Sequence, residues 1–146
     1  MKQLGSGTFR PRARDGLADF AMPSRPLRIA LVTPRFGDTY YGFTHALPII
    51  FGRPMAAMPV GSLPLLAALV PAPHEVEIFD DGLVPVDIER LRTFDIIGLT
   101  GMITQNERMF EILAALRDFS GLLLVGGPYA SISEDSFSGS CDAIFV

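Results

Sequence analysis

The chain has 146 residues, of which 49% are apolar and 19% are charged, and its formal net charge is −4. This length and composition predict one domain with a hydrophobic core and argue against disorder of the whole chain. The negative balance gives no basic surface for nucleic acid. A single cysteine, Cys141, excludes an internal disulfide and any multi-cysteine metal or iron–sulfur site built by this chain alone. Its solitary presence fits a reducing, cytoplasmic location.

The first 26 residues differ in charge from the rest of the chain. Residues 1–26 contain five cations and two anions, net +3, whereas residues 27–146 contain seven cations and fourteen anions, net −7. The first segment holds no apolar run of signal-peptide length, so secretion is not indicated. We interpret residues 1–26 as a mobile basic tail and residues 27–146 as the folded domain.

A long uncharged stretch could be taken for a membrane-spanning helix. Residues 54–74 contain no Asp, Glu, Lys or Arg, and a hydropathy window could score them as a membrane span. The same stretch contains five prolines, and each costs about 3 kcal/mol in the interior of a helix. The prolines are Pro54, Pro59, Pro64, Pro71 and Pro73. We therefore expect no membrane span.

Five segments have the patterns of β-strands, namely 27–33, 75–79, 94–100, 122–125 and 142–146. The run 122–125 is apolar without alternation, which is typical of a parallel strand covered on both faces. Residues 75–79 alternate polar and apolar side chains, which predicts a half-exposed edge strand. Pro34 follows the first run, Asp80-Asp81-Gly82 turns the chain after the second, and Gly126 and Gly127 follow the run 122–125.

Helical patterns lie between these strands. Ser62 is placed to cap a helix over 63–70, and a short helix is expected around 86–91. Residues 104–107 form a capping box that begins a helix, and 131–134 repeat its spacing. The helix after residue 104 has one apolar face, at positions i, i+3, i+4 and i+7. These positions are Met109, Ile112, Leu113 and Leu116.

The alternation of strands and helices predicts the fold. Parallel strands joined by right-handed crossovers form an α/β, three-layer, doubly wound sheet. For five strands we expect the flavodoxin-like, Rossmann-like order 2-1-3-4-5. The last predicted strand lies at the end of the sequence, which is compatible with a domain truncated at its C-terminus.

In such a sheet, ligands bind beyond the carboxyl ends of the strands, where the strand order reverses. The predicted crevice is bordered by the loops 34–62, 100–105 and 126–131. Gly126 and Gly127 permit positive φ and close approach of a ligand to the backbone. Tyr129 could stack on a planar ligand or pack as an ordinary loop residue. The candidate cofactor-binding residues are Thr33, Pro34, Gly61, Ser62, Thr100, Gly101, Met102, Gln105, Gly126, Gly127, Pro128 and Tyr129.

Other kinds of site find less support. Residues 33–37 read Thr-Pro-Arg-Phe-Gly, so the dinucleotide fingerprint is absent after the first strand. Asp80 and Asp81 precede a glycine, and we interpret them as turn residues. Of the two histidines, His74 is expected to be solvent-exposed and His45 lies in an aromatic loop where it could face a ligand. Neither has a nucleophile and carboxylate at a recognisable spacing.

Several segments together resemble a known family. They look like the amino-terminal cobalamin-binding domain of cobalamin-dependent radical S-adenosylmethionine enzymes, and the loop 41–47 with Gly52 and Arg53 resembles the hopanoid-methylase-like subgroup. The similar segments are 27–33, 57–71, 74–80, 95–100, 124–130 and 142–146. These segments occur in the order and at the spacing of the family, and the resemblance covers about residues 27–146.

The resemblance implies that a corrin ring lies over the carboxyl edge of the sheet and that the nucleotide tail enters the crevice near Thr100, Gly126 and Gly127. The Asp-x-His-x-x-Gly motif of cobalamin-dependent mutases is absent, so we expect base-off cobalamin without an axial histidine. The Cys-x-x-x-Cys-x-x-Cys motif is absent too, so we expect no iron–sulfur cluster and no catalysis by this chain alone. The implied partner is a radical S-adenosylmethionine catalytic domain in cis or in trans.

Two alternatives stay open at the level of sequence. One is a degenerate α/β docking domain that binds no cofactor. The other is a small nucleotide-binding protein or enzyme on the same sheet, with His45 or the Asp80–Asp81 pair as catalytic groups.

Overall fold

A computed structural model describes residues 23–37, 46–52 and 60–146. The predicted aromatic loop began at Pro34 and ended at Pro59; its residues 38–45, with His45, and 53–59 lie outside the described residues, and residues 46–51 are helical rather than loop. The strands are β1 (Arg28–Thr33), β2 (Glu75–Asp80), β3 (Ile96–Thr100), β4 (Leu122–Gly126) and β5 (Ala143–Phe145). The α-helices are α1 (Ala46–Phe51), α2 (Ser62–Leu69), α3 (Ile88–Leu91), α4 (Asn106–Ala115) and α5 (Pro128–Ile132). Two 3₁₀ turns complete the order, η3 (Ile103–Gln105) and η4 (Glu134–Phe137).

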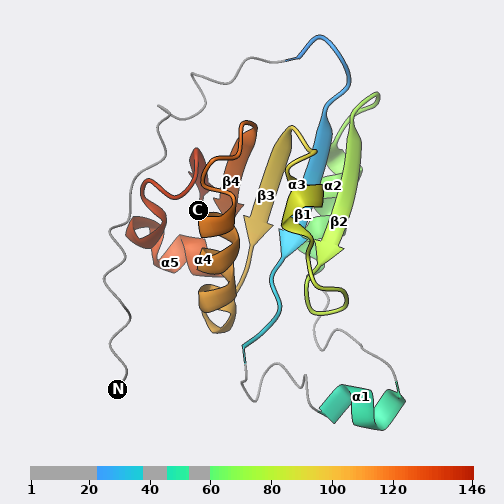
Figure 1. Cartoon of the computed structure of the whole chain (residues 1–146), viewed down its shortest axis with the longest axis vertical. Coiled ribbons are helices and arrows are strands. Elements are labelled where there is room, and N and C mark those ends of the chain that lie inside the picture. Colours follow the sequence, from blue (N-terminus) through green and yellow to red (C-terminus); the bar gives the residue numbers. More distant parts are fainter. Residues whose placement is uncertain (1–22, 38–45, 53–59) are drawn as a thin grey trace.

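The five strands form one sheet in the order β2-β1-β3-β4-β5, and every neighbouring pair is parallel. The predicted flavodoxin-like order is therefore confirmed, and β2 lies at an edge as its alternating pattern indicated. The arrowheads in Figure 1 all point to one end of the sheet, so the carboxyl ends of the strands share one edge. Strand order reverses between β1 and β3, which places the switch point at that edge.

The hydrophobic core lies between the sheet and the layer that contains α3 and α4, in front of the sheet in Figure 1. Alternate residues of the three central strands point into it, and α4 supplies the apolar face that the sequence predicted. The strand residues are Ala30, Val32, Ile97, Leu99, Leu123 and Val125, and the helix residues are Met109, Ile112, Leu113 and Leu116. Each large side chain buried here contributes about 1.5 to 3 kcal/mol of transfer free energy.

Polar contacts fix the amino edge of the sheet. The Asp95 carboxylate accepts hydrogen bonds from the Arg25 guanidinium at 2.9 and 2.6 Å and from the backbone N–H of Arg28 at 2.8 Å. The hydrogen bonds from Arg25 hold the pKa of Asp95 below its ordinary value. His74 lies at the same edge, half-buried, and its Nδ1 accepts from the N–H of Leu27 at 3.1 Å. The prediction that His74 is solvent-exposed was therefore wrong.

The predicted helix caps differ from the observed ones. The residue that precedes α2 is Gly61, without a side-chain cap, so Ser62 is the first helical residue and not the cap. The helix α4 begins at Asn106, one residue later than the capping box predicted, and the buried Thr104 hydroxyl has no hydrogen-bond partner among the described residues. Ser131 lies inside α5, where its hydroxyl donates to the carbonyl of Gly127 at 3.2 Å. No helix in the described part of the chain is both long and apolar enough to cross a membrane.

Candidate functional site

The described residues cover only part of the sheet face that lies opposite the main core. The helix α2 packs over β1 and β2, behind the sheet in Figure 1, and beside it a groove of about 400 Å³ opens over β3 and β4. We call this the α2 groove. Its volume lies in the range of small-molecule sites, about 300 to 1,000 Å³. It is lined by Leu31, Ser62, Leu63, Leu66, Val70, Gly98, Leu99, Thr100, Leu124, Val125, Gly126, Gly127 and Phe145.

Two glycines on neighbouring strands line the α2 groove. Gly98 lies in register between Leu31 of β1 and Leu124 of β4. A Cβ at Gly98 would come within 3.1 Å of the Leu31 side chain, so the glycine allows Leu31 to pack closely against the backbone of β3. Gly126 ends β4, and a Cβ there would meet Phe145 at an ordinary 3.5 Å.

Gly127 sets the turn at the mouth of the groove. Its φ is 90°, a conformation that favours glycine, and a Cβ on it would lie 2.1 Å from Oγ1 of Thr100. The turn is also tied to the end of β3, because the N–H of Tyr129 donates to the carbonyl of Gly101 at 3.1 Å. The expected need for glycine at this position is confirmed, and its cause is contact with β3 as well as backbone conformation.

A buried amide braces the loops on the two sides of the switch point. Gln105, only 2% exposed, accepts from the N–H of Met102 at 2.8 Å through Oε1. Its Nε2 donates to the carbonyl of Pro34 and lies 3.4 Å from the Thr33 hydroxyl. The bonds of Gln105 are thus directed to protein groups, and this side chain positions the loops after β1 and β3 rather than facing the α2 groove.

A buried ion pair fixes the loop after β2. The Asp81 side chain is 0% exposed and accepts from Nε and Nη2 of Arg108 at 2.8 and 3.0 Å, and from the N–H groups of Val86 and Arg35. Burial alone would raise the pKa of Asp81, but these hydrogen bonds outweigh it and hold the pKa below its ordinary value. The interpretation of Asp81 as a simple turn residue was incomplete, whereas Asp80 does accept from the N–H of Gly82 at 2.9 Å.

The twelve predicted site residues divide into groups. Four line the α2 groove, namely Ser62, Thr100, Gly126 and Gly127. Three are buried where the Gln105 side chain connects the loops after β1 and β3, namely Thr33, Pro34 and Gln105 itself. Gly101 is also buried, and a Cβ on it would meet the Met109 sulfur at 2.6 Å. Three are exposed, namely Gly61, Met102 and Pro128.

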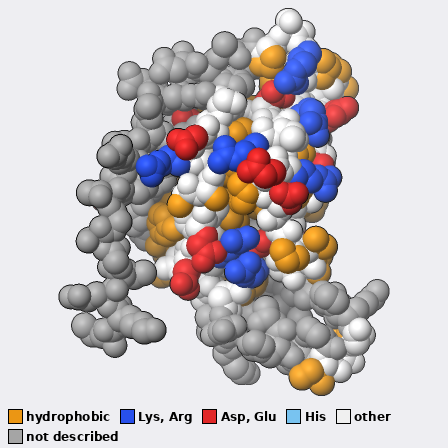
Figure 2. Space-filling view, in the orientation of Figure 1, with side chains coloured by type: hydrophobic (Ala, Val, Ile, Leu, Met, Phe, Trp, Pro, Cys, Tyr) orange, Lys and Arg blue, Asp and Glu red, His pale blue; other side chains and the backbone are white. Residues whose placement is uncertain are grey.

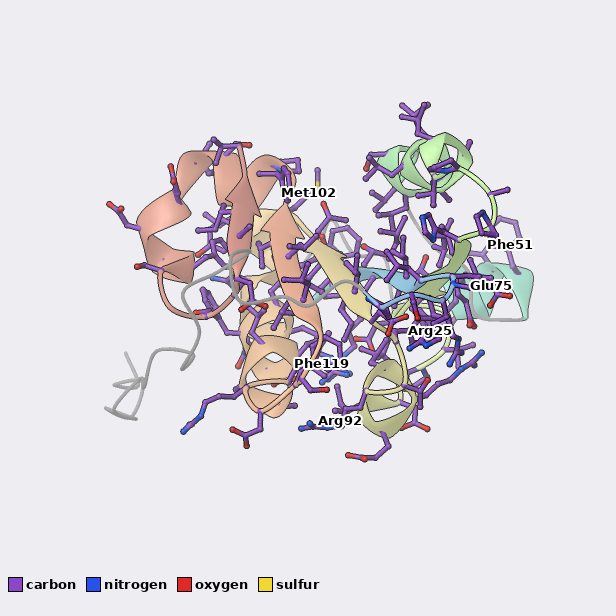
Figure 3. All side chains as sticks on the ribbon, turned by 90° about the horizontal axis from the view of Figure 1, so that it is seen from above. Arg25, Phe51, Glu75, Arg92, Met102 and Phe119 are labelled. Carbon is purple, nitrogen blue, oxygen red and sulfur yellow. The ribbon has the colours of Figure 1, made fainter. Side chains whose placement is uncertain are left out.

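The twelfth residue, Tyr129, packs inside the protein. Its ring is 8% exposed and lies edge-on to Phe137, with the ring centroids 5.3 Å apart. The loop-packing alternative is therefore what the structure shows. Met102 is 40% exposed, and Figure 3 shows its side chain on the side of the sheet where α2 lies.

Sequence reasoning missed most of the apolar lining of the groove. Leu31, Leu66, Leu124 and Phe145 all contribute to it, and none was a candidate. One signal was present, because Gly98 interrupts the apolar strand β3 and an isolated glycine in a strand marks close approach of another group.

The lining determines the chemistry that this site accepts. None of the side chains that line the α2 groove is charged, and the polar groups are the Ser62 and Thr100 hydroxyls together with the backbone. A flat apolar group with a few hydrogen-bonding atoms fits such a lining, whereas a ligand recognised by ion pairs does not. The alternative of catalysis by Asp80 and Asp81 is not favoured, because the Asp81 carboxylate is buried against Arg108.

Comparison with known proteins gives two distant relatives. The chain is 27% identical over 110 residues to a hopanoid C-2 methylase of Rhodopseudomonas palustris (strain TIE-1), a match that covers 75% of this chain and 21% of that protein. It is also 27% identical over 109 residues to the uncharacterized methyltransferase sll1242 of Synechocystis sp. (strain ATCC 27184 / PCC 6803 / Kazusa), covering 75% of this chain and 20% of the relative. The chain thus spans about a fifth of the length of these relatives. No family model and no solved structure matches it.

Proposed function

We propose that this chain is a cofactor-binding module related to methylases, and that it binds cobalamin at the carboxyl edge of its sheet. The observation that carries the proposal is the open, uncharged α2 groove, floored by Gly98 between Leu31 and Leu124 at the switch point of the sheet. Relatedness to a hopanoid C-2 methylase and to a second methyltransferase supports a role in methylation.

The residues of the groove suit one part of this cofactor. Its nucleotide tail ends in a flat, largely apolar benzimidazole base, which matches walls made by Leu66, Leu124 and Phe145. The hydroxyls of Ser62 and Thr100 are placed to hydrogen-bond polar atoms of the tail, and Gly126 leaves its backbone accessible. Bound cobalamin would supply the cobalt chemistry of methyl transfer.

The protein's part in this proposal is binding and orientation. The Gln105 amide and the Asp81–Arg108 pair hold three loops at the carboxyl edge, so the loops that would face the corrin ring are held by contacts within the protein. Turnover would require a radical S-adenosylmethionine catalytic domain, in cis or in trans, which we propose as the partner.

Retention of cofactor tests the proposal. We expect the purified chain, mixed with hydroxocobalamin and desalted, to elute with a roughly equimolar amount of cofactor by absorbance. Gly126→Val adds three carbons at the groove and should reduce retention at least about tenfold, the equivalent of 1.4 kcal/mol. Ala114→Leu adds three carbons at an exposed position of α4 and serves as the matched control. A colourless wild-type eluate would contradict cobalamin binding.

The same comparison shows whether cobalamin binds in the α2 groove or elsewhere on the chain. If wild type and Gly126→Val retain the cofactor equally, cobalamin binds this chain elsewhere and the α2 groove is not its site. Circular dichroism of both variants shows whether they remain folded, and the ordinary 3.5 Å distance to Phe145 predicts that Gly126→Val does.

A further inference from the structure

One wall of the α2 groove is a single face of the helix α2. Ser62, Leu66 and Val70 lie at positions i, i+4 and i+8, and all three line the groove, whereas Leu65 and Leu69 are not among its described lining residues. Ser62 is the first residue of the helix and Val70 follows the last, so this wall is about 12 Å long at 1.5 Å per residue. The wall therefore carries a hydroxyl at one end and is apolar along the rest of its length.

The free hydrogen-bonding groups of the groove lie at its mouth. The helix α2 connects the parallel strands β1 and β2, so Ser62 lies near the carboxyl edge, where Thr100 ends β3. Further in, the backbone groups of Gly98 and Leu124 are used within the sheet, because β3 and β4 each pair with a strand on both sides. A ligand group that reaches the inner part of the groove thus meets leucine side chains and finds no free hydrogen-bond partner among the described residues.

The lining of the α2 groove also differs in charge from the other face of the sheet. Figure 2 shows positively and negatively charged side chains interspersed over the face that carries α3 and α4. None of the described side chains that line the α2 groove is charged. Discrimination between ligands in this groove therefore depends on neutral groups, that is, on whether their buried atoms are apolar or need hydrogen bonds.

We propose that the α2 groove selects among corrinoid cofactors by the base of their nucleotide tail, accepting 5,6-dimethylbenzimidazole and disfavouring adenine. The inference rests on the cobalamin binding proposed above, and it makes Leu66 a specificity-determining residue. Both bases are flat bicyclic groups. The outer edge of dimethylbenzimidazole carries two methyl groups, which suit walls made by Leu66 and Leu124, whereas the outer edge of adenine carries an amine and ring nitrogens. Those nitrogen atoms would lose hydrogen bonds with water and gain no partner, which costs binding free energy.

Equilibrium dialysis of the full chain against two corrinoids tests the inference. The probes are hydroxocobalamin and the hydroxo form of adeninylcobamide, in which adenine replaces dimethylbenzimidazole. The measured quantity is the dissociation constant for adeninylcobamide divided by that for cobalamin. We expect Leu66→Gln to lower this ratio at least about tenfold relative to wild type, because the new amide is a partner for adenine and replaces an apolar wall. The two bases bind cobalt with different strength in the free cofactors, but this difference cancels when the ratios of two protein variants are compared.

Leu65→Gln is the matched control for this experiment. It makes the same change one residue earlier on α2, at a side chain that is 62% exposed and is not a described lining residue of the groove. Leu66 is itself 49% exposed, and glutamine is as good a helix former as leucine, so both variants should fold, which circular dichroism verifies. We expect Leu65→Gln to leave the ratio of dissociation constants at the wild-type value.

The outcomes separate this inference from the proposed function. If both corrinoids bind and the ratio is the same in wild type and Leu66→Gln, the chain still binds cobalamin but the groove does not select the base, and the inference is overturned. An equal change of the ratio in Leu65→Gln would also overturn it, because the effect would then not arise in the groove. If wild type retains neither corrinoid, the proposed function fails and the inference fails with it.

Discussion

At the scale of single residues, the carboxyl edge depends on groups whose partners are distant in sequence. Asp81 sits in an Asp-Asp-Gly context that is typical of a turn, yet its main partner, Arg108, is 27 residues further along the chain. No local pattern pairs the two. Gly127 was predictable, because two glycines after an apolar strand indicate a tight turn, but its close approach to Thr100 follows only from the pairing of β3 with β4.

We predict that Asp81→Asn lowers the free energy of unfolding by about 3 kcal/mol at pH 7, because it removes the buried carboxylate that pairs with Arg108 and leaves only the exposed Glu111 as its ionic partner. The folded-state pKa of Asp81 lies below its ordinary value of 3.8, so its contribution is present above that pH and is lost as pH falls through the folded-state pKa. Urea unfolding between pH 7 and pH 3 should show the difference between wild type and variant shrinking at the acid end. If the difference in unfolding free energy between wild type and Asp81→Asn stayed constant with pH, the ionised Asp81 carboxylate would not be the group that stabilises the fold.

Gly127 permits a prediction that separates strain from steric contact. Gly127→Ala should destabilise the fold, because φ of 90° costs a non-glycine residue about 1 to 3 kcal/mol and its Cβ would contact Oγ1 of Thr100. Thr100→Ala removes that oxygen. The double variant should therefore recover the stability lost through the steric contact but not the stability lost through the positive φ. A double-mutant cycle of unfolding free energies measures the coupling, for which we expect a value within about 0.5 to 3 kcal/mol. Additive effects would show that the two residues do not meet.

At the scale of elements, strands were predicted more reliably than helix starts. The runs 27–33 and 122–125 are apolar enough to identify buried parallel strands, and they correspond to β1 and β4 with ends shifted by one residue. The first residue of a helix depends on which side chain accepts a hydrogen bond from which backbone N–H. At the start of α4, hydrogen bonds to residues distant in sequence determine this. The Gln105 amide takes the N–H of Met102 and the carbonyl of Pro34, and α4 begins only after this brace.

We predict opposite outcomes for two adjacent substitutions at the start of α4. Gln105→Leu should lower the free energy of unfolding by about 1 to 3 kcal/mol, because a buried N–H and a buried carbonyl lose their partner. Thr104→Val should be neutral or stabilising, since it removes a buried hydroxyl that has no hydrogen-bond partner in the described part of the chain. Chemical denaturation of the two variants measures both. If Thr104→Val proved the more damaging, the capping role first assigned to Thr104 would be restored.

At the scale of the whole molecule, the fold class followed from the alternation of strands and helices, whereas the shape of the candidate site did not. Strand order placed the switch point between β1 and β3, and with it the loops that border the site. The α2 groove depends on how far α2 covers the sheet, and Leu124 and Phe145 line the groove that opens beside this helix. Packing of this kind is set by the whole chain, so apolar lining residues looked like core residues in the sequence.

The last prediction concerns the axial side of cobalt. His74 lies at the amino edge of β2 and accepts from the N–H of Leu27, about 20 Å from the carboxyl edge at about 3.3 Å per strand residue. It therefore cannot ligate a cobalt held over the carboxyl edge, and the motif that places an axial histidine in cobalamin-dependent mutases is missing around His45. We expect the absorbance spectrum of the bound cofactor to be that of base-off cobalamin, and His45→Ala to leave it unchanged. His74→Ala, the matched control, should weaken the amino edge but not alter the spectrum. A spectrum of histidine-ligated cobalt that disappears in His45→Ala would show that this chain supplies the axial ligand after all.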